Sequence, residues 1–362
     1  MRVRNAIVII GGEHHNTLGM LRCIGMAGLN ADIIILGAHT SFISKSKYIN
    51  SLHHQTSLDG LIDLLRSLYA DERLNPVLFT CSDSAESFLD NHYDDLKNSF
   101  AFFNAGKQSM ITGLMNKQTQ IQLAVNVGLE VPYSIEFNGI VDGILYPCIV
   151  KPVESIKGGK QVEICKDESE LKEVLLHFDK NNKVQIQQLL EKEKEIVVLG
   201  VSVNEEIVIR GFIDKQREHD GGTLYSTVRP IEDLNDGLVD SCKALIKECG
   251  YEGLFGIEFI QNKGHYYYIE TNFRNDATTY ALACAGVNLP LIYYLAKTGQ
   301  DYSNEKNKKV RVVNSIVEWN DFKHRKENNV PLLLWIRDFF GAKCKYYWNW
   351  KDPLPFFFAP FK

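Results

Sequence analysis

The chain has 362 residues, a length that predicts two or three domains rather than one small module. Hydrophobic residues make up 45% and charged residues 23% of the sequence, which is ordinary globular composition and excludes global disorder. The formal net charge is −5 and no long Lys/Arg block occurs, so the sequence argues against a nucleic-acid partner.

Neither a targeting segment nor a membrane span is predicted. The apolar run at residues 6–10 is too short for a signal peptide, and no stretch approaches the ~20 apolar residues that a membrane span needs. The eight cysteines are scattered and form no Cys-x-x-Cys pair, which disfavours a disulfide framework or a zinc cage. We therefore expect a cytoplasmic protein without a transmembrane segment.

Strands and helices alternate in the first hundred residues. The pattern predicts a strand at 5–10 that stops at Gly11 and Gly12, a helix at about 17–27 and a strand at 32–36. A helix capped by Ser57 and a strand at 77–80 follow. Such alternation is typical of parallel βαβ units, so residues 1–105 are expected to form a small doubly wound α/β domain.

The rest of the chain reads as α+β. Asn204-Glu205 is a hairpin turn between two antiparallel strands, and the turn at 262–264 joins another pair. The expected helices are 116–127, 168–178, 236–249, 278–285 and 289–298; the expected strands are 144–150, 161–165, 197–203, 206–213, 254–261 and 265–271. We divide the rest of the chain into three parts, residues 106–186, 187–300 and 301–362.

Two familiar nucleotide motifs are absent. The segment Gly158-Gly159-Lys160-Gln161 lacks the upstream glycine and the Ser/Thr of a P-loop, and the glycines at 11, 12 and 19 lack the G-x-G-x-x-G spacing of a dinucleotide site. The pairs at 14–15 and 53–54 are not metal sites, because adjacent side chains diverge on a helix or a strand.

Basic residues indicate a phosphate site in the middle of the chain. Lys151 ends an apolar strand, where a lysine costs desolvation free energy unless an anion pairs with it. The loop that follows contains Gly158 and Gly159, whose backbone N–H groups are able to approach phosphates closely. Lys117 opens a helix, at the end where anions collect.

An acidic set indicates a metal site. Glu258 lies in an otherwise apolar strand, and Glu270 and Asn272 share one face of its hairpin partner by the strand period of two. Two carboxylates and an amide oxygen suit Mg²⁺, a hard cation that keeps few protein ligands besides substrate phosphates. Arg274 continues the same side and would hold a carboxylate or phosphate; a buried Glu–Arg ion pair is the alternative.

In this order, the residues resemble the ATP-grasp superfamily of carboxylate–amine ligases. The resemblance covers about residues 1–300 and includes Lys117, the Val-Lys-Pro strand at Lys151, a Gln-x-x-x-Glu-like hinge at 187–191, and Glu-x-Asn-x-Arg at 270–274. The segments 16–22 and 46–48 are similar to the subgroup of D-aspartate ligase and carbamoyl-phosphate-synthase-like proteins of surface-polysaccharide clusters.

The resemblance implies a fold and a set of roles. An α/β N-terminal domain would precede a two-lobed α+β ATP-grasp fold that clamps ATP between antiparallel sheets. Lys117 and Lys151 would hold phosphates, and the glycine-rich loop would cover them. The remaining implied contacts are Gln188, Leu189 and Leu190 beside adenine, Glu195 on the ribose hydroxyls, and Glu258, Glu270 and Asn272 on one or two Mg²⁺ (or Mn²⁺) ions.

The implied activity is ATP-dependent C–N bond formation that releases ADP. Phosphoryl transfer would convert a carboxylate to an acyl phosphate, and an amine would then attack the acyl carbon. Surface-polysaccharide or peptidoglycan precursors are the implied setting. A regulatory ATP-binding protein and an ATP-grasp kinase are the alternatives.

Substrate contacts are expected within 210–229, where Arg229 is the main candidate for a catalytic or substrate-binding arginine beside Arg274. The candidates there are Arg210, Asp214, Lys215, Arg217, Glu218, His219 and Arg229.

The last 28 residues contain eleven aromatic side chains. We expect this tail to pack on the protein's own lobes or on a second subunit of a homodimer, with contact to a membrane surface as the alternative. Three prolines argue against one continuous helix in this segment.

Overall fold

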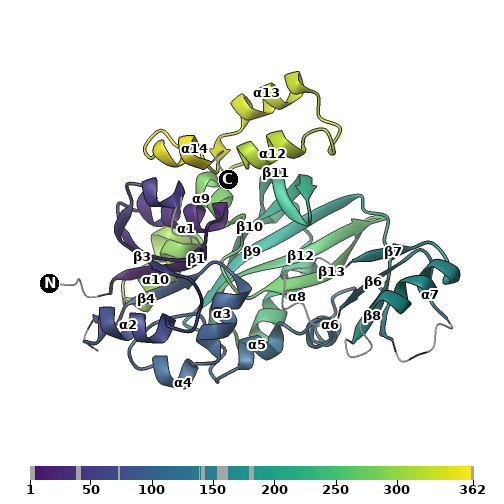
Figure 1. Ribbon diagram of the computed structural model, residues 1–362, viewed down its shortest axis with the longest axis horizontal. Coiled ribbons are helices and arrows are strands. Elements are labelled where there is room, and N and C mark those ends of the chain that lie inside the picture. Colours follow the sequence, from purple (N-terminus) through teal and green to yellow (C-terminus); the bar gives the residue numbers. More distant parts are fainter. Residues whose placement is uncertain are drawn as a thin grey trace.

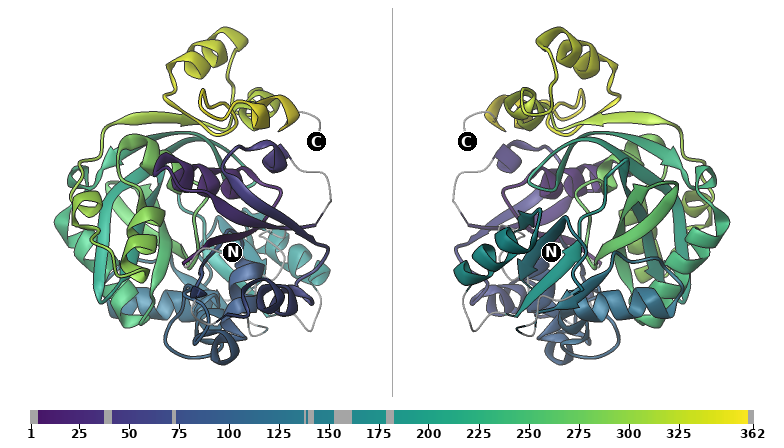
Figure 2. Two further views of the ribbon diagram at one scale, coloured as in Figure 1. Left: turned by 90° about the vertical axis from the view of Figure 1, so that its left-hand side faces the viewer. Right: turned by 90° about the vertical axis from the view of Figure 1, so that its right-hand side faces the viewer.

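A computed structural model describes residues 5–37, 42–71, 74–137, 139, 143–152, 162–178 and 183–359. The predicted phosphate loop with Gly158 and Gly159 lies outside these residues. Three sheets organise the chain, and the C-terminal helices lie together at one end of the molecule (Figures 1 and 2).

The N-terminal sheet is parallel, as the alternating pattern predicted, with strand order β3-β2-β1-β4. Its β-branched strands are buried on both faces, which explains their unbroken apolar runs. The elements are β1 (Ile7–Gly12), α1 (His15–Met26), β2 (Ala31–Leu36), the 3₁₀ turn η1 (Phe42–Lys45), β3 (Ile49–Gln55), α2 (Leu61–Tyr69), β4 (Val77–Thr80), α3 (Asp83–Asp90) and α4 (Tyr93–Leu96).

Two details of this domain were not predicted correctly. Strand β3 is half-buried at the sheet edge and contains polar residues, so its sequence lacks a clear apolar signal. The Ser57 cap is wrong, because α2 begins after Gly60 without a side-chain cap.

The second sheet is small and antiparallel, with order β5-β8-β6-β7. Together with α7 it encloses its own apolar core around Cys148, Val150 and Ile186. The elements are α5 (Met110–Leu114), α6 (Lys117–Asn126), β5 (Ser134–Glu136), β6 (Cys148–Pro152), β7 (Glu163–Cys165), α7 (Glu168–His177) and β8 (Val184–Gln188).

The third sheet has seven strands, in the order β13-β12-β9-β10-β11-β14-β15. Both predicted hairpins are confirmed; Asn204 and Glu205 form the first turn with φ of 51° and 64°. The elements are β9 (Lys194–Val203), β10 (Glu206–His219), β11 (Gly222–Pro230), the 3₁₀ turn η3 (Ile231–Asp233), α8 (Asp236–Glu248), β12 (Gly253–Asn262), β13 (His265–Asn272), α9 (Thr279–Ala285), α10 (Leu289–Lys297), α11 (Ser303–Lys306) and β14 (Val313–Ile316).

The N-terminal domain and the large sheet share one hydrophobic core. Helix α1 packs on α9 and α10, and α10 packs on β9, so the largest apolar cluster runs from β1 to β12 without interruption. In contrast, the small sheet packs mainly within itself and forms a separate lobe.

Residues 318–359, which we call the C-terminal cap, comprise α12 (Glu318–His324), α13 (Leu332–Gly341), β15 (Cys344–Lys345) and α14 (Leu354–Phe358). As expected for the aromatic tail, part of the cap packs on the chain itself: Tyr346 and Tyr347 are buried. Two buried arginines hold the cap. Arg22 pairs with Asp352, and Arg217 pairs with both Asp321 and Asp338.

Within the described ranges, no helix is by itself long and apolar enough to cross a bilayer. Helices α9 and α10 pass that test only as a pair, and they are bent by 95° where they meet. Most of their residues lie in the core.

Candidate active site

The predicted metal ligands converge on one face of the large sheet. Glu258 of β12 and Glu270 of β13 are direct cross-strand partners, so both carboxylates stand on the same face. Asn272 lies two residues further along that face, and its Nδ2 donates to Glu258 Oε1 at 3.1 Å. The hairpin alone produces this arrangement, which is why sequence spacing was able to predict it.

A third carboxylate, Asp276, joins the group and was not predicted. Asn272 Nδ2 lies 3.4 Å from Asp276 Oδ2. The buried Asp276 side chain packs over Gly256, where an added Cβ would lie 3.1 Å from the same oxygen. The alternation Glu270-x-Asn272-x-Arg274-x-Asp276 was the available signal, although the chain has left the strand by Asp276.

Lys215 of β10 supplies the positive charge on this face. Its Nζ lies 3.0 Å from Glu258 Oε2 and also bonds Glu195 of β9. Lys215 was predicted only as one of seven candidates for substrate contact. Lys215 of β10 contacts Glu258 of β12 across β9, which lies between these two strands.

The carboxylates repel one another when no cation is bound. Burial, with the charges of Glu270 and Asp276, raises the pKa of Glu258 to about 7, although Lys215 acts in the opposite direction. The pKa of Lys215 is raised by its two carboxylate partners in spite of its burial. Three carboxylates and one amide at this point are a donor set that fits Mg²⁺, whose charge would relieve the repulsion.

Two lysines approach the site from different elements: Lys151 belongs to the small sheet, whereas Lys117 belongs to α6, which packs on β13 and α8. Lys151 of β6 is buried, and its Nζ donates to Gln187 Oε1 of β8 at 2.9 Å. Burial and the neighbouring charge of Lys117 lower the pKa of Lys151 to about 8, while Glu270 acts to raise it. Lys117 is the first residue of α6, and Asn116 caps that helix as predicted. Gln187 belongs to the predicted hinge segment, but its hydrogen bond with Lys151 was not predicted.

The predicted adenine hinge connects β8 to β9. The N–H groups of Gln188 and Leu189 already donate to the carbonyls of Tyr133 and Pro147, at 2.8 and 3.0 Å. Within the described part of the chain, no acceptor pairs with the next N–H group, that of Leu190. Of the three predicted residues, Leu190 is therefore the one with a backbone donor free for a ligand.

Glu195, the predicted ribose ligand, is bound by two lysines. Its Oε1 pairs with Lys215, and its Oε2 lies 3.1 Å from Lys192 Nζ. These cations lower the pKa of Glu195, although burial opposes them. Lys192 also pairs with Glu218, so Glu218 belongs to the rim of this network.

Arg274 connects the N-terminal domain to the predicted metal ligands. Its Nε lies 2.6 Å from Asp83 Oδ1 at the start of α3, and its Nη2 donates to Asn272 Oδ1 at 3.1 Å. His14 lies in the turn after β1 and is exposed. Partial desolvation and the Arg274 charge lower the His14 pKa to about 4. Sequence analysis did not assign His14 a role, since nothing local links it to Arg274.

Arg229 does not join the other predicted residues. It lies opposite Phe212 and pairs with Asp214 and Asp233, at 3.3 and 3.5 Å. Because neighbouring strand residues face opposite sides, Asp214 points away from Lys215 and from the carboxylate face. The structure thus groups Arg229 with the reverse side of the sheet.

Most of the other charged residues between 210 and 219 contact the C-terminal part of the chain. Arg210 donates to the carbonyl of Lys306, and Arg217 is buried against Asp321 and Asp338. Neither pairs with the carboxylate face: Arg210 contacts the end of α11, and Arg217 contacts α12 and α13 of the cap.

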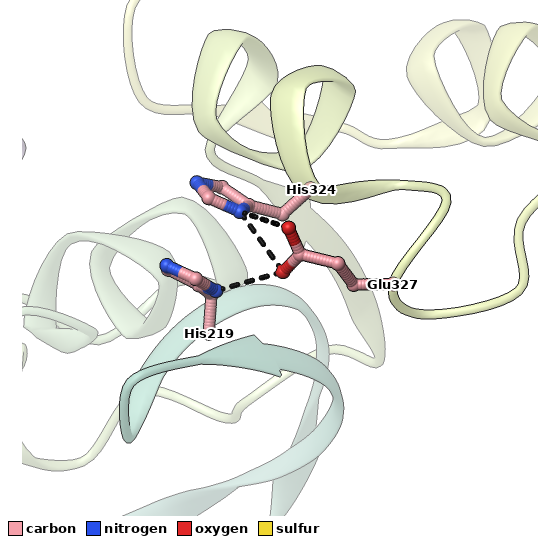
Figure 3. A group of neighbouring side chains, drawn as sticks. All are labelled: His219, His324 and Glu327. Carbon is pink, nitrogen blue, oxygen red and sulfur yellow. Dashed lines mark hydrogen bonds and ion pairs between the residues drawn. The ribbon is translucent and has the colours of Figure 1, made fainter.

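Another cluster of ligand-type side chains lies at the end of β10 (Figure 3). The Nδ1 atoms of His219 and His324 lie 2.9 and 3.0 Å from Glu327 Oε2, and the two rings stack at 3.4 Å with 20° between their planes. An imidazole lone pair lies in the ring plane, so near-parallel rings do not aim at a common ion. We therefore interpret the group as a hydrogen-bonded clasp that fastens the cap to β10, in which His324 is the main cause of the lowered Glu327 pKa.

Comparisons with known proteins agree with this geometry. The model of the ATP-grasp domain matches residues 116–285. The carbamoyl phosphate synthase large chain of Clostridium botulinum (strain Loch Maree) is 32% identical over 142 residues; the match covers 37% of this chain but only 13% of the relative.

Solved structures extend the similarity to the N-terminal domain. N5-carboxyaminoimidazole synthetase from Staphylococcus aureus, solved with ADP, has a TM-score of 0.63 at 14% identity and covers 91% of this chain and 87% of its own. L-amino acid ligase from Bacillus licheniformis has a TM-score of 0.64 at 15% identity, with coverages of 86% and 80%. At these identities the likeness establishes the fold, an α/β domain followed by a two-lobed α+β region.

Proposed function

We propose, on the premise that residues 116–285 form an ATP-grasp domain, that the chain is an ATP-dependent carboxylate–amine ligase that releases ADP. The observation that carries the proposal is the convergence of Glu258, Glu270 and Asn272 with Lys151 and Lys215 between two lobes. The named activities of the similar proteins agree with it, but they belong to those proteins.

Each residue then has a chemical task. Glu258, Glu270 and Asn272 would hold one or two Mg²⁺ (or Mn²⁺) ions, which neutralise charge on the transferred phosphoryl group. Lys151 of the small lobe and Lys117 of α6 would pair with phosphate oxygens. The Leu190 N–H would read the adenine edge, and Glu195 would accept the ribose hydroxyls after Lys192 or Lys215 shifts toward the phosphates.

The protein itself supplies position and charge rather than a covalent nucleophile. A carboxylate aligned with the γ-phosphorus becomes an acyl phosphate, and an amine then displaces phosphate from the acyl carbon. Arg274 would orient the carboxylate, and its contacts with Asn272 and with Asp83 of the N-terminal domain support this role. Arg229, on the reverse face, has no part in this scheme.

The setting of the reaction is also a proposal. All eight cysteines are free thiols, most of them buried, which suits a reducing compartment such as the cytoplasm. The substrates are small molecules, and precursors of a surface polysaccharide or peptidoglycan remain the proposed class. A homodimer stays a prediction.

The test is the nucleotide product and the trapping of the intermediate. Pooled amino acids and sugar acids are supplied with MgATP, and ADP release is followed; with an active carboxylate, hydroxylamine should yield a hydroxamate. Glu270→Gln should abolish trapping with little change in stability, because the amide keeps the shape but weakens metal binding.

The matched control is Glu163→Gln, an exposed strand glutamate of β7, which should trap normally. AMP in place of ADP would contradict the acyl-phosphate route. Undiminished trapping by Glu270→Gln would contradict the metal site, and a phosphorylated product that no amine consumes would identify a kinase.

A further inference from the structure

The C-terminal cap exposes an unusual share of the apolar surface. Nine of the eighteen large apolar residues that are exposed in the described part of the chain belong to residues 318–359. They are Phe322, Leu332, Leu333, Ile336, Phe340, Trp350, Leu354, Phe357 and Phe358. Such concentration on one segment marks an interaction surface rather than scattered surface residues.

Helix α13 has two apolar faces, of which only one is covered. Trp335 and Phe339, four residues apart, pack inward with Tyr225 and Ile316. Leu333, Ile336 and Phe340 follow at spacings of three and four on the outer side, and Leu333 and Phe340 are 81% and 77% exposed. A helix that is apolar around most of its circumference requires a second apolar environment.

The segment that contains α14 repeats the pattern at the same end of the molecule (Figures 1 and 2). Phe356 packs inward on Trp319 and Trp348, with ring centroids 4.9 and 5.2 Å apart. Trp350, Phe357 and Phe358 remain exposed, and Trp350 is 85% exposed. Lys45 stands over the Phe358 ring at 5.0 Å, so a cation borders this apolar group.

Most acidic residues of the cap are buried. Of its five acidic residues, Glu318, Asp321, Asp338 and Asp352 are buried. Asp352 binds Arg22, Asp321 and Asp338 bind Arg217, and Glu318 accepts from the backbone N–H groups of Tyr347 and Trp348. The fifth acid, Glu327, is engaged in the histidine clasp.

The bases of the cap face outward instead. Five of its seven lysines and arginines are exposed, namely Lys323, Lys326, Arg337, Lys343 and Lys351. The chain as a whole has a net charge of −5, so this basic and apolar surface differs in sign from the rest of the molecule. Four of the five acids are buried where the cap docks, and Glu327 is exposed, so exposed bases outnumber exposed acids on the outer surface.

We propose that this surface of the cap docks on an anionic lipid bilayer. Aromatic and aliphatic side chains would enter the interfacial layer, and the surrounding lysines and arginines would pair with lipid headgroups. A second copy of the chain fits less well, since a two-fold contact through the same patch would set bases against bases. The proposal does not depend on the ligase activity, because no residue of the carboxylate face takes part.

The experiment measures sedimentation of the full-length protein with phospholipid vesicles. Binding is expected to vesicles with about one-third phosphatidylglycerol, and to fall at high salt or with phosphatidylcholine alone. Leu333→Ser/Phe357→Ser and Lys343→Glu/Lys351→Glu should each weaken vesicle binding about tenfold or more. Since these side chains are exposed, the thermal melting of both double variants should match that of the wild type.

Two control variants test whether the effect is local to the cap. Leu176→Ser removes an apolar side chain that is 85% exposed on α7, and Lys247→Glu reverses an exposed charge on α8. Both should bind vesicles like the wild type.

Several outcomes would overturn the proposal. They are absence of binding to the anionic vesicles, equal loss in the control variants, and a dimer in lipid-free solution that Leu333→Ser/Phe357→Ser converts to monomer. The last result would assign the surface to a second copy. Quenching of tryptophan fluorescence by brominated lipid, reduced in Trp350→Phe, would support insertion of the cap.

Discussion

Glu258 and Lys151 are the two groups whose charge states would decide nucleotide binding at the proposed site. Burial raises the pKa of Glu258 to about 7 and, together with Lys117, lowers that of Lys151 to about 8. Both shifts come mainly from desolvation, so near pH 7 Glu258 is about half protonated and a small fraction of Lys151 is neutral until a ligand binds. A metal ion and a phosphate would restore the charged forms together.

A narrow pH optimum for binding follows from these values. Glu258 must lose its proton to bind a cation, which disfavours binding below about pH 7, and Lys151 must keep its proton to bind phosphate, which disfavours binding above about pH 8. We expect the association constant for MgADP, measured by calorimetry, to peak between these pH values and to fall up to about tenfold per unit outside them.

Lys151→Arg separates the two limbs of this profile. Arginine stays protonated throughout the range, so the alkaline decline should disappear while the acidic decline remains. A wild-type affinity that is constant from pH 6 to pH 9, or an alkaline limb unchanged in Lys151→Arg, would show that these groups do not contact the nucleotide.

The helices and strands of the cap depend on charges brought from other parts of the chain. Arg22 of α1 is fully buried and donates to the carbonyls of Tyr346 and Tyr347 as well as to Asp352. This one side chain therefore fastens the segment between β15 and α14 to the N-terminal domain. Arg217 has the same function for α12 and α13.

Arg22→Met should destabilise the protein by about 3–5 kcal/mol, because Asp352 would be left as a buried charge without its partner. Urea unfolding measures the loss, and limited proteolysis should cut the variant first within the cap. Arg22→Met/Asp352→Leu should recover part of the stability, since no charge then remains buried. Arg66→Met, on the exposed face of α2, is the control; a change of under about 1 kcal/mol for Arg22→Met would refute the role.

Across the whole molecule, two bodies with apolar cores of unequal size meet at the proposed site. The N-terminal sheet and the large sheet share one core through α1, α9 and α10. Among its described residues, the small lobe has a separate core of six buried apolar side chains, and its strands pack mainly among themselves. Lys151 belongs to this smaller body, so closure of the lobe would move a lysine relative to a fixed carboxylate face.

Hydrogen exchange should reveal this difference directly. We expect amides of β6, β7 and β8 to exchange faster than those of β9 and β12, because fewer buried contacts protect them. MgADP should slow exchange in the small lobe, and amides of β1 and β2 should serve as the unaffected reference. Equal protection of the three sheets, or no effect of nucleotide on β6, would contradict the two-body description.

Local sequence patterns determined the carboxylate site. Glu258 and Glu270 are placed by a hairpin whose turn is visible at 262–264, and the period of two sets Asn272 on the same face. Asn116 as helix cap and Lys151 at a strand end are equally local features. Such contacts span few residues, so propensity and periodicity suffice to predict them.

Only the tertiary structure decided which distant strands lie side by side and which faces they share. Lys215 enters the site because β9 lies between β10 and β12, whereas Arg229 faces the reverse side. Nothing in the sequence near Arg217 indicated that it would be buried by Asp321 and Asp338, more than a hundred residues away. Strand order and ion pairing at such separations are set by the packing of the whole core, and a short sequence window does not contain that information.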